Sequence, residues 1–341
     1  METAAAQQRK SLRTGNTPVI ELEFSVDGVK RLLKLKLESH NPQGSLKDRI
    51  ADPLIDNVAD KIDPEIGLIE STSGNLGVAI AAACNQRGIR FNAIVDPRVS
   101  PVLIERMRQL DAQVEVVSEP DSLGGYLMSR IRYVHEQLER RPGLVWTNQY
   151  ENKANPYAHF ESTAPELWRQ LPGPATVLVP VSTGGTLAGL TWFARERSVP
   201  WRLIGVDVTG SAALGKSPGQ RLLSGIGSSR RSHFVDAAEV EAVHVYPAEA
   251  VSACLWVSDR AGVNIGGSSG ATVAAALRVF RDAPDVDEII CICPDGGDRY
   301  QTTIYHPSWR EAHGVADADL GDDIEFLRAR CVNTPKEEPY A

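Results

Sequence analysis

Short apolar segments alternate with helix-like segments along most of the chain, and this alternation constrains the fold more than any other feature. The segments with the composition of buried strands are 67–72, 91–96, 113–118, 144–150, 176–182, 202–208 and 288–295. Helical patterns lie between most of them, for example at 126–138 and 164–171. Strands that alternate with helices predict an α/β fold, with mostly parallel sheets covered by helices on both faces.

The length of the chain, 341 residues, suggests two domains of this kind. We expect two three-layer α/β domains with a boundary near residue 150. The N-terminal domain would comprise 1–150 and the C-terminal domain 151–315. The acidic and polar segment 316–341 is predicted to be a poorly ordered tail.

Composition excludes several classes of partner. The net charge of -8 argues against nucleic acid, whose binding surfaces are basic, but it leaves room for a small anionic substrate in a cleft with a local arginine. No run approaches the ~20 apolar residues that span a bilayer, and the N-terminus lacks the apolar core of a signal peptide. Five cysteines without a CxxC pair predict neither a disulfide framework nor a metal site. These features favour a cytoplasmic protein that acts on small molecules.

Turns rich in small residues follow several of the expected strands, at 71–75, 182–186, 266–270 and 293–298. In open α/β sheets ligands bind at the carboxyl ends of the strands, so these turns are candidate binding loops. The segment Ser182-Thr183-Gly184-Gly185-Thr186 follows an apolar strand and precedes a helix. Converging backbone N–H groups and the helix N-terminus could bind a phosphate there. A plain tight connection between strand and helix is the alternative.

A second phosphate motif competes with this one. Residues Gly210 to Ser217 match the P-loop pattern G-x-x-x-x-G-K-[ST] and follow the strand at 202–208. A P-loop requires a helix directly after it. Here Pro218-Gly219 and further glycines follow, which is the composition of a loop. We interpret the match as accidental and keep a P-loop nucleotide enzyme centred on Lys216 as an alternative.

Lys47 is the candidate reactive amine. Ser45 and Asp48 have the spacing of a capping box, which predicts that a helix begins at Leu46. The apolar face of that helix would consist of Leu46, Ile50, Leu54 and Val58. In the first turn the helix dipole disfavours an ammonium, and a lowered lysine pKa is what Schiff-base chemistry requires. A solvated surface lysine is the alternative.

The turn at 71–75, with sequence STSGN, offers hydroxyl groups and a side-chain amide at the start of a helix. Backbone N–H groups in such a turn can bind a carboxylate. Ser73 or Asn75 would also serve as an N-cap, and the two functions are compatible.

These loops occur in a familiar order. The segments NPQGSLKDR (41–49), ESTSGNLGVA (70–79), NQYENKANP (148–156), STGGT (182–186) and GGSSGA (266–271) resemble the β-family of pyridoxal-phosphate enzymes, the cysteine synthase group. The resemblance covers about residues 15–305. It implies a tryptophan-synthase-β-like fold with pyridoxal 5'-phosphate bound between two α/β domains, and a homodimer.

The resemblance also implies roles for individual residues. Lys47 matches the lysine that carries the cofactor as a Schiff base, Asn75 the residue that hydrogen-bonds the ring hydroxyl, and Ser268 the partner of the pyridine nitrogen. The phosphate loop, which begins at Ser182, matches through Thr183, Gly184, Gly185 and Thr186. The residues that match those binding the substrate carboxylate are Thr72, Ser73 and Gln149. A hydroxyl opposite the ring nitrogen suits β-elimination better than transamination.

The chain departs from the sulfide-using cysteine synthases at Tyr150, where phenylalanine is usual, and at Ser182, where glycine is usual. Segments 95–101, 119–131 and 225–230 resemble instead the N-(2-amino-2-carboxyethyl)-L-glutamate synthases. That subfamily joins O-phospho-L-serine to L-glutamate on the way to 2,3-diaminopropionate, a precursor in siderophore and peptide-antibiotic pathways. Arg130 and Arg230 could then bind the anionic substrates, with added polar contacts from Tyr150 and Ser182.

Two further alternatives remain open. The chain could be a cysteine synthase that uses O-acetyl- or O-phosphoserine with sulfide, or a catalytically silent relative that only binds a partner enzyme.

Overall fold

The computed structural model describes residues 13–122, 124–236, 239–316, 320–321 and 323–332. The strands are β1 (Val19–Val26), β2 (Val29–Leu37), β3 (Leu68–Ser71), β4 (Phe91–Val95), β5 (Gln113–Val116), β6 (Val145–Trp146), β7 (Ala175–Pro180), β8 (Trp201–Val208), β9 (Glu241–Val245), β10 (Glu288–Cys293) and β11 (Ile324–Val332). The α-helices are α1 (Asp48–Asp56), α2 (Asn75–Arg87), α3 (Pro101–Gln109), α4 (Leu127–Arg140), α5 (Ala154–Ala158), α6 (Ala164–Gln170), α7 (Gly185–Arg197), α8 (Pro247–Ala261), α9 (Gly267–Asp282) and α10 (Pro307–Ala312).

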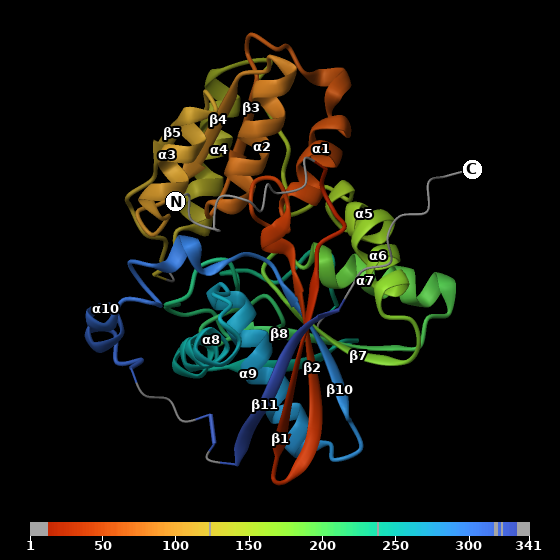
Figure 1. Ribbon diagram of the computed structural model, residues 1–341. Coiled ribbons are helices and arrows are strands. Elements are labelled where there is room, and N and C mark those ends of the chain that lie inside the picture. Colours follow the sequence, from red (N-terminus) through yellow and green to blue (C-terminus); the bar gives the residue numbers. More distant parts are fainter. Residues whose placement is uncertain (1–12, 123, 237–238, 317–319, 322, 333–341) are drawn as a thin grey trace, which may run out of the picture.

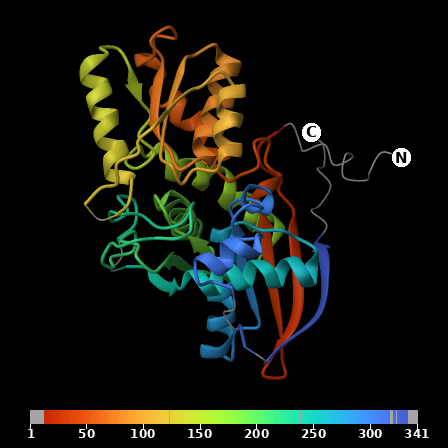
Figure 2. The same ribbon diagram turned by 90° about the vertical axis from the view of Figure 1, so that its left-hand side faces the viewer.

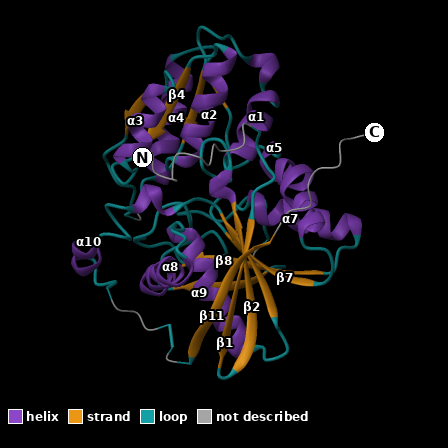
Figure 3. Cartoon of the chain, viewed as in Figure 1, coloured by secondary structure: helices purple, strands orange, loops and turns teal. Residues whose placement is uncertain are grey.

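The strands form two sheets (Figures 1 and 3). The larger has the order β11-β1-β2-β10-β7-β8-β9, and the smaller has the order β5-β4-β3-β6. Every pair is parallel except the two pairs that β1 makes, with β2 and with β11. The helices pack on these sheets, and the expected α/β class with mostly parallel sheets is confirmed.

The expected domain boundary at residue 150 is wrong for the first part of the chain. The hairpin β1–β2 belongs to the larger sheet, because β2 pairs in parallel with β10 through Leu32↔Glu288 to Leu37↔Cys293. The hairpin turn at Asp27-Gly28 has φ values of 51° and 74°, which an Asp-Gly pair readily adopts. The smaller domain is therefore an insertion between β2 and the rest of the larger domain (Figure 2).

The expectation that 316–341 form a poorly ordered tail is also wrong for part of the segment that the structure describes. Residues Ile324–Val332 form β11, which pairs antiparallel with β1 from Val26↔Ile324 to Val19↔Val332. Arg328 and Arg330 form ion pairs of 2.6 Å with Glu23 and Glu21 of that strand. The sequence of this segment is polar because most of its side chains face solvent, although its backbone pairs with β1 at the edge of the sheet. Residues 333–341 lie outside the described part.

Helix α1 begins at Asp48, two residues later than expected, so Lys47 occupies the N-cap position. The preceding residues are held by the loop after β10: Ser45 bridges to Asp295, and the Leu46 N–H donates to the Pro294 carbonyl at 2.8 Å. The apolar face is confirmed, because Leu46, Ile50, Leu54 and Val58 are all buried. The start of α1 is thereby fixed between the two domains.

The region of the rival P-loop contains no helix. Between β8 and β9 the described residues form turns, bends and irregular segments only, and Lys216 is exposed. Without a helix N-terminus the loop lacks the dipole and the converging N–H groups of a P-loop. The nucleotide-enzyme alternative therefore has no structural support. In the described part of the chain, no helix combines the length and hydropathy needed to cross a membrane.

Candidate active site

The predicted binding loops meet in a narrow cavity of about 50 Å³ between the two domains. Its lining includes most of the residues singled out from the sequence: Lys47, Thr72, Ser73, Asn75, Gln149, Tyr150, Ser182, Thr183, Gly184, Thr186 and Ser268. These residues come from segments up to 221 positions apart, from Lys47 to Ser268, so the tertiary structure brings them together. Gly185 is the next residue in the same turn, and two arginines, Arg130 and Arg230, lie elsewhere.

Lys47 projects from the start of α1 and lines the cavity. Burial lowers the pKa of its ammonium to about 8, with the nearby Asp295 carboxylate acting in the opposite direction. Its backbone N–H donates to Ser45 Oγ at 3.2 Å, which orients the turn. A substantial fraction of the Lys47 amine is therefore neutral near physiological pH, as a nucleophile or general base must be.

The 182–186 turn is shaped as a phosphate cup. Gly184 has φ of 88° and caps α7, whose first N–H groups face the turn. A Cβ on Gly185 would lie 2.0 Å from Asn155 Oδ1, so only glycine fits there. Asn155 in turn donates from Nδ2 to Thr183 Oγ1 at 3.2 Å and to the Gln149 carbonyl at 2.8 Å. The cup therefore combines a helix N-terminus, backbone N–H groups and two threonine hydroxyls.

His159 supports this cup, and the sequence reasoning missed it. The imidazole is fully buried in the π-helical turn η4 (His159–Thr163), with Nδ1 2.8 Å from Thr163 Oγ1 and Nε2 3.2 Å from Thr186 Oγ1. Burial, reinforced by the nearby Lys47 charge, holds the pKa of His159 well below 6.5. The ring is therefore neutral. If Thr163 donates to Nδ1, then Nε2–H donates to Thr186 and leaves that hydroxyl free to donate to a phosphate.

Asn75 is the first residue of α2, and its side chain contacts the opposite domain. Its Nδ2 donates to Asp295 Oδ2 at 2.7 Å, and its Oδ1 accepts from Arg299. Asp295 is buried, also accepts from the Tyr300 hydroxyl at 2.8 Å, and has a pKa that burial raises. The sequence had marked the 293–298 turn without assigning these residues. The hydrogen bond expected from Asn75 to the ring hydroxyl of the cofactor stays a prediction.

Ser268 lies in the first turn of α9 and is buried, with its side chain at the cavity wall. It offers a neutral hydroxyl at this position, whereas an aspartate or glutamate side chain here would bring a negative charge.

The 71–75 turn is organised by Thr72, and the expected N-cap was wrong. Gly74 is the N-cap of α2, with φ of 123°, and Thr72 Oγ1 accepts the N–H groups of Gly74 and Gly77 at 3.0 Å each. A Cβ on Gly74 would lie 2.6 Å from Leu103 Cδ1, so the turn depends on glycine. Ser73 is consequently exposed toward the cavity.

Gln149 and Tyr150 both point back to this turn. Gln149 Nε2 donates to the Ser71 carbonyl at 2.8 Å, and the Tyr150 hydroxyl lies 3.4 Å from the same oxygen. The buried Glu70 holds the 147–150 segment through Thr147 Oγ1 at 2.5 Å and the Gln149 N–H at 3.2 Å. Burial raises the pKa of Glu70 to about 7.

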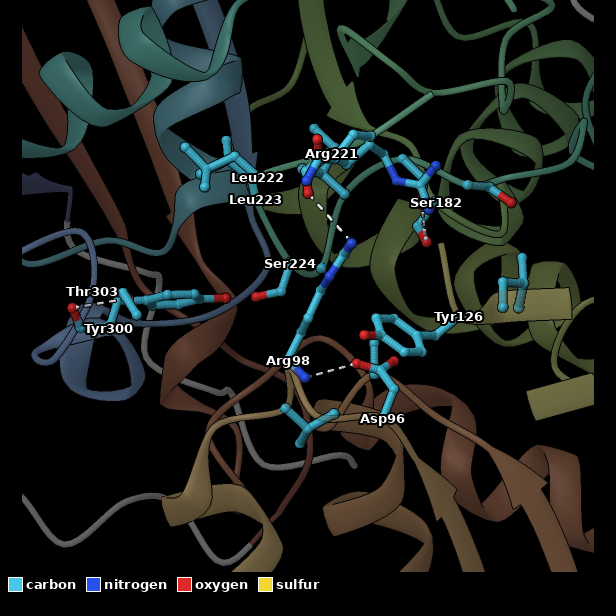
Figure 4. Close-up of a pocket in the computed structure, with 18 of the residues that line it drawn as sticks. Asp96, Arg98, Tyr126, Ser182, Arg221, Leu222, Leu223, Ser224, Tyr300 and Thr303 are labelled. Atoms are coloured by element: carbon cyan, nitrogen blue, oxygen red, sulfur yellow. Dashed lines mark hydrogen bonds between the residues drawn. The ribbon is translucent and has the colours of Figure 1, made fainter. Parts of the chain in front are cut away.

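A second, larger cavity of about 430 Å³ adjoins the first (Figure 4). Ser73, Tyr150, Ser182 and Gly225 line both cavities, so the two adjoin one another. Arg130 lines the larger one and is only 5% exposed, and two of its nitrogens, Nε and Nη1, have no hydrogen-bond partner among the described residues. Its Nε lies 3.4 Å from the Asp96 carboxylate. Asp96 compensates the charge of this buried guanidinium only in part, and the remaining donors of Arg130 can bind an anion.

Arg230 is placed differently from expectation. It does not belong to the lining of either cavity, and its guanidinium pairs with Glu151 at 3.1 Å and stacks 5.2 Å above the Tyr150 ring. Its assignment as a substrate-binding residue stays a prediction.

The donors around the smaller cavity fit pyridoxal phosphate. The cup suits a phosphate dianion, Lys47 offers a partly neutral amine for the aldehyde, and Ser268 offers a hydroxyl for a ring nitrogen. The fit rests on the chemistry of these groups, because the cavity itself is narrow. The described residues contain no group of three or more metal-ligating side chains.

Comparison with known proteins agrees with this donor set. Residues 10–295 match the model of the pyridoxal-phosphate dependent enzyme family. The chain is 40% identical over 299 residues to N-(2-amino-2-carboxyethyl)-L-glutamate synthase of Ralstonia nicotianae, covering 86% of this chain and 88% of that protein. It is 38% identical over 302 residues to the protein of the same name from Cupriavidus metallidurans, covering 86% and 89%.

Solved structures give the same fold. The O-acetylserine-dependent cystathionine β-synthase of Helicobacter pylori superposes with a TM-score of 0.77 at 30% identity, covering 86% of this chain and 97% of that one. O-ureido-L-serine synthase superposes with a TM-score of 0.75 at 26% identity, covering 85% and 92%.

Proposed function

The chain belongs to the pyridoxal-phosphate dependent enzymes, and from this premise we propose that it joins O-phospho-L-serine to L-glutamate with release of phosphate. It is a β-replacement synthase, and the relatives at 38–40% identity carry the name of the proposed product. The observation that carries the substrate proposal is Arg130, a buried guanidinium in the larger cavity whose Nη1 has no hydrogen-bond partner among the described residues.

Pyridoxal phosphate supplies an electron sink that makes the α-proton of a bound amino acid acidic. The cup residues, with His159 behind Thr186, would hold its phosphate, and Ser268 would face the ring nitrogen. The turn at 72–73 and Gln149 would bind the substrate carboxylate. Lys47, with its lowered pKa, would take the α-proton and later return it.

The bond changes balance without another reactant. The Cβ–O bond of O-phosphoserine breaks and phosphate leaves with the bonding pair. The glutamate nitrogen forms a bond to the same Cβ and loses a proton to solvent. The α-proton that Lys47 removes returns to the α-carbon, so the enzyme ends as it began.

Arg130, Tyr150 and Ser182 would bind the leaving phosphate. Tyr150 and Ser182 line both cavities, and Arg130 lines the larger one next to them. A guanidinium and two hydroxyls match a phosphate dianion through charge-assisted hydrogen bonds, whereas an acetyl ester has no charge for Arg130 to bind. Burial raises the pKa of Tyr150, so its hydroxyl stays protonated and can donate.

The runner-up is a cysteine synthase that adds sulfide to O-acetyl- or O-phosphoserine. The structural likeness to an O-acetylserine-dependent enzyme favours it. A homodimer and a role in 2,3-diaminopropionate supply for siderophores or peptide antibiotics are further proposals, and light scattering of the purified protein tests the first.

The test is mass spectrometry of products from O-phosphoserine or O-acetylserine, each mixed with L-glutamate or sulfide. We expect the glutamate adduct from O-phosphoserine as the main product, and none from Lys47→Ala protein. Replacing Arg130 with glutamine should raise KM for O-phosphoserine by about tenfold or more, with a smaller effect for O-acetylserine. Rapid cysteine formation without a glutamate adduct would establish the runner-up instead.

A further inference from the structure

Two arginines that the proposed function leaves unassigned, Arg98 and Arg221, meet in the larger cavity from opposite domains (Figure 4). Arg98 follows β4 in the smaller domain, and Arg221 lies in the long loop between β8 and β9 of the larger one. Arg98 Nη1 donates to the backbone carbonyl of Arg221 at 3.3 Å, which joins the two segments where both residues line the cavity. With Arg130 they place three guanidinium groups around one space.

Asp96 also lines this cavity and lies 3.4 Å from Arg130 Nε, so one carboxylate offsets part of the charge of the three guanidinium groups. Arg98 donates also to the Gly124 carbonyl at 2.9 Å, and Arg221 donates to the Gly210 carbonyl at 3.2 Å and to Ser229 Oγ at 3.1 Å. All these acceptors are uncharged, and neither arginine forms an ion pair within the described residues. Burial, and next the charge of Arg98, lowers the pKa of Arg221. The cavity therefore has a positive potential that favours a polyanionic ligand.

Part of the remaining wall is apolar. Side chains of Val99, Leu127, Leu222, Leu223 and Ile226 line the cavity beside the guanidinium groups. A ligand with charged ends joined by methylene groups would match both parts of this lining. Inorganic phosphate or a sulfide ion has no apolar part and would leave these side chains in contact with water.

We propose that Arg98 and Arg221 form a subsite for the carboxylates of the amine substrate, an α-amino dicarboxylic acid, while Arg130 serves the phosphate of the other substrate. The inference rests on the proposed function and adds the residues that select the nucleophile. The subsite adjoins the Lys47 cavity along Ser73, Tyr150 and Ser182, which line both spaces. An amine bound there faces the cavity in which its target is held.

The first experiment measures binding without turnover. Glutarate, a dicarboxylate that lacks the amine, is titrated into the holoenzyme by calorimetry. Arg98→Gln and Arg221→Gln should each weaken glutarate binding about tenfold or more, because each removes a charge-assisted contact. Arg90→Gln and Arg195→Gln, which alter exposed arginines of the two domains, should bind as the unaltered protein does.

The second experiment separates the two substrates. Phosphate release from O-phosphoserine alone should stay within about threefold in Arg98→Gln and Arg221→Gln, which also shows that both proteins are folded. KM for L-glutamate should rise about tenfold or more, and the preference for L-glutamate over L-glutamine should fall with it. Arg98→Lys and Arg221→Lys keep the positive charge but lose the planar guanidinium. Their KM for L-glutamate should lie between that of the unaltered enzyme and those of the glutamine variants.

The outcomes distinguish the inference from the proposed function. Glutarate binding that is undetectable, or equal in all proteins, would overturn the subsite. So would a loss of phosphate release, which would place these arginines on the phosphate instead. If glutarate binding depends on both arginines but the unaltered enzyme releases no phosphate from O-phosphoserine, the subsite stands and the proposed leaving group is wrong.

Discussion

Replacing Glu166 with glutamine should destabilise the protein far more than an isosteric change at the surface. Glu166 Oε1 lies 2.5 Å from Lys36 Nζ, and Oε2 lies 3.0 Å from Arg49 Nη1. Arg49 also pairs with the buried Glu38 at 2.6 Å. These four side chains are at most 5% exposed and form a balanced cluster of two cations and two anions. Glutamine at 166 would leave one buried positive charge without compensation.

The size of this destabilisation follows from the pKa of the Glu166 carboxylate. Burial alone would raise its pKa, but the charges of Lys36 and Arg49 lower the pKa of Glu166 from 4.5 to about 2. By linkage, that difference corresponds to about 3 kcal/mol of folding free energy. Breaking a buried ion pair costs about 3–5 kcal/mol in other proteins, which agrees. Because the folded pKa is depressed, this stabilisation is present above pH 4.5 and is lost as pH falls toward 2.

Thermal unfolding followed by circular dichroism measures the effect. At pH 7 we expect Glu166→Gln to lower Tm by roughly 4–7 °C. The matched control is Glu65→Gln, which removes the carboxylate of an exposed 2.6 Å pair with Arg90 and should cost about 0–1 kcal/mol. The difference in Tm between Glu166→Gln and the unaltered protein should decrease as pH falls from 5 to 3. Equal Tm values for both variants, or a gap independent of pH, would refute the electrostatic reasoning.

Other predictions concern the cofactor site. The rate at which apoenzyme takes up pyridoxal phosphate should increase as pH rises through about 8, because the Lys47 amine loses its proton there; a flat profile followed by absorbance would contradict this. His159→Leu should raise the cofactor dissociation constant about two- to tenfold, measured by fluorescence titration, because Thr186 loses a partner; His159→Gln should recover part of the affinity. Gly185→Ala should weaken cofactor binding more strongly, because its Cβ would displace Asn155, and unchanged affinity would show that the cup adapts.

The sequence predicted much of the fold and the contents of the site. The apolar segments located the four strands of the smaller sheet and β7, β8 and β10 of the larger one, and the ordered loops identified the residues that line the Lys47 cavity. It did not reveal the β1–β2 hairpin, although the Asp27-Gly28 pair between alternating apolar residues was an available signal. Nor did it reveal β11, because an edge strand with exposed polar side chains has no apolar pattern to detect.

Residue types and their local spacing are written in the sequence, and these determined the α/β class, the glycine-dependent cup and the identity of the candidate amine. Which side chains from distant segments face one another is a property of the packed chain alone. Only the tertiary structure placed His159 behind Thr186, moved the expected tail into the sheet, and brought Arg98 and Arg221 together across two domains. The local pattern of apolar and polar residues depends on which side of a segment is exposed to water. The pairing of two distant segments depends instead on the contacts that they make in the folded chain.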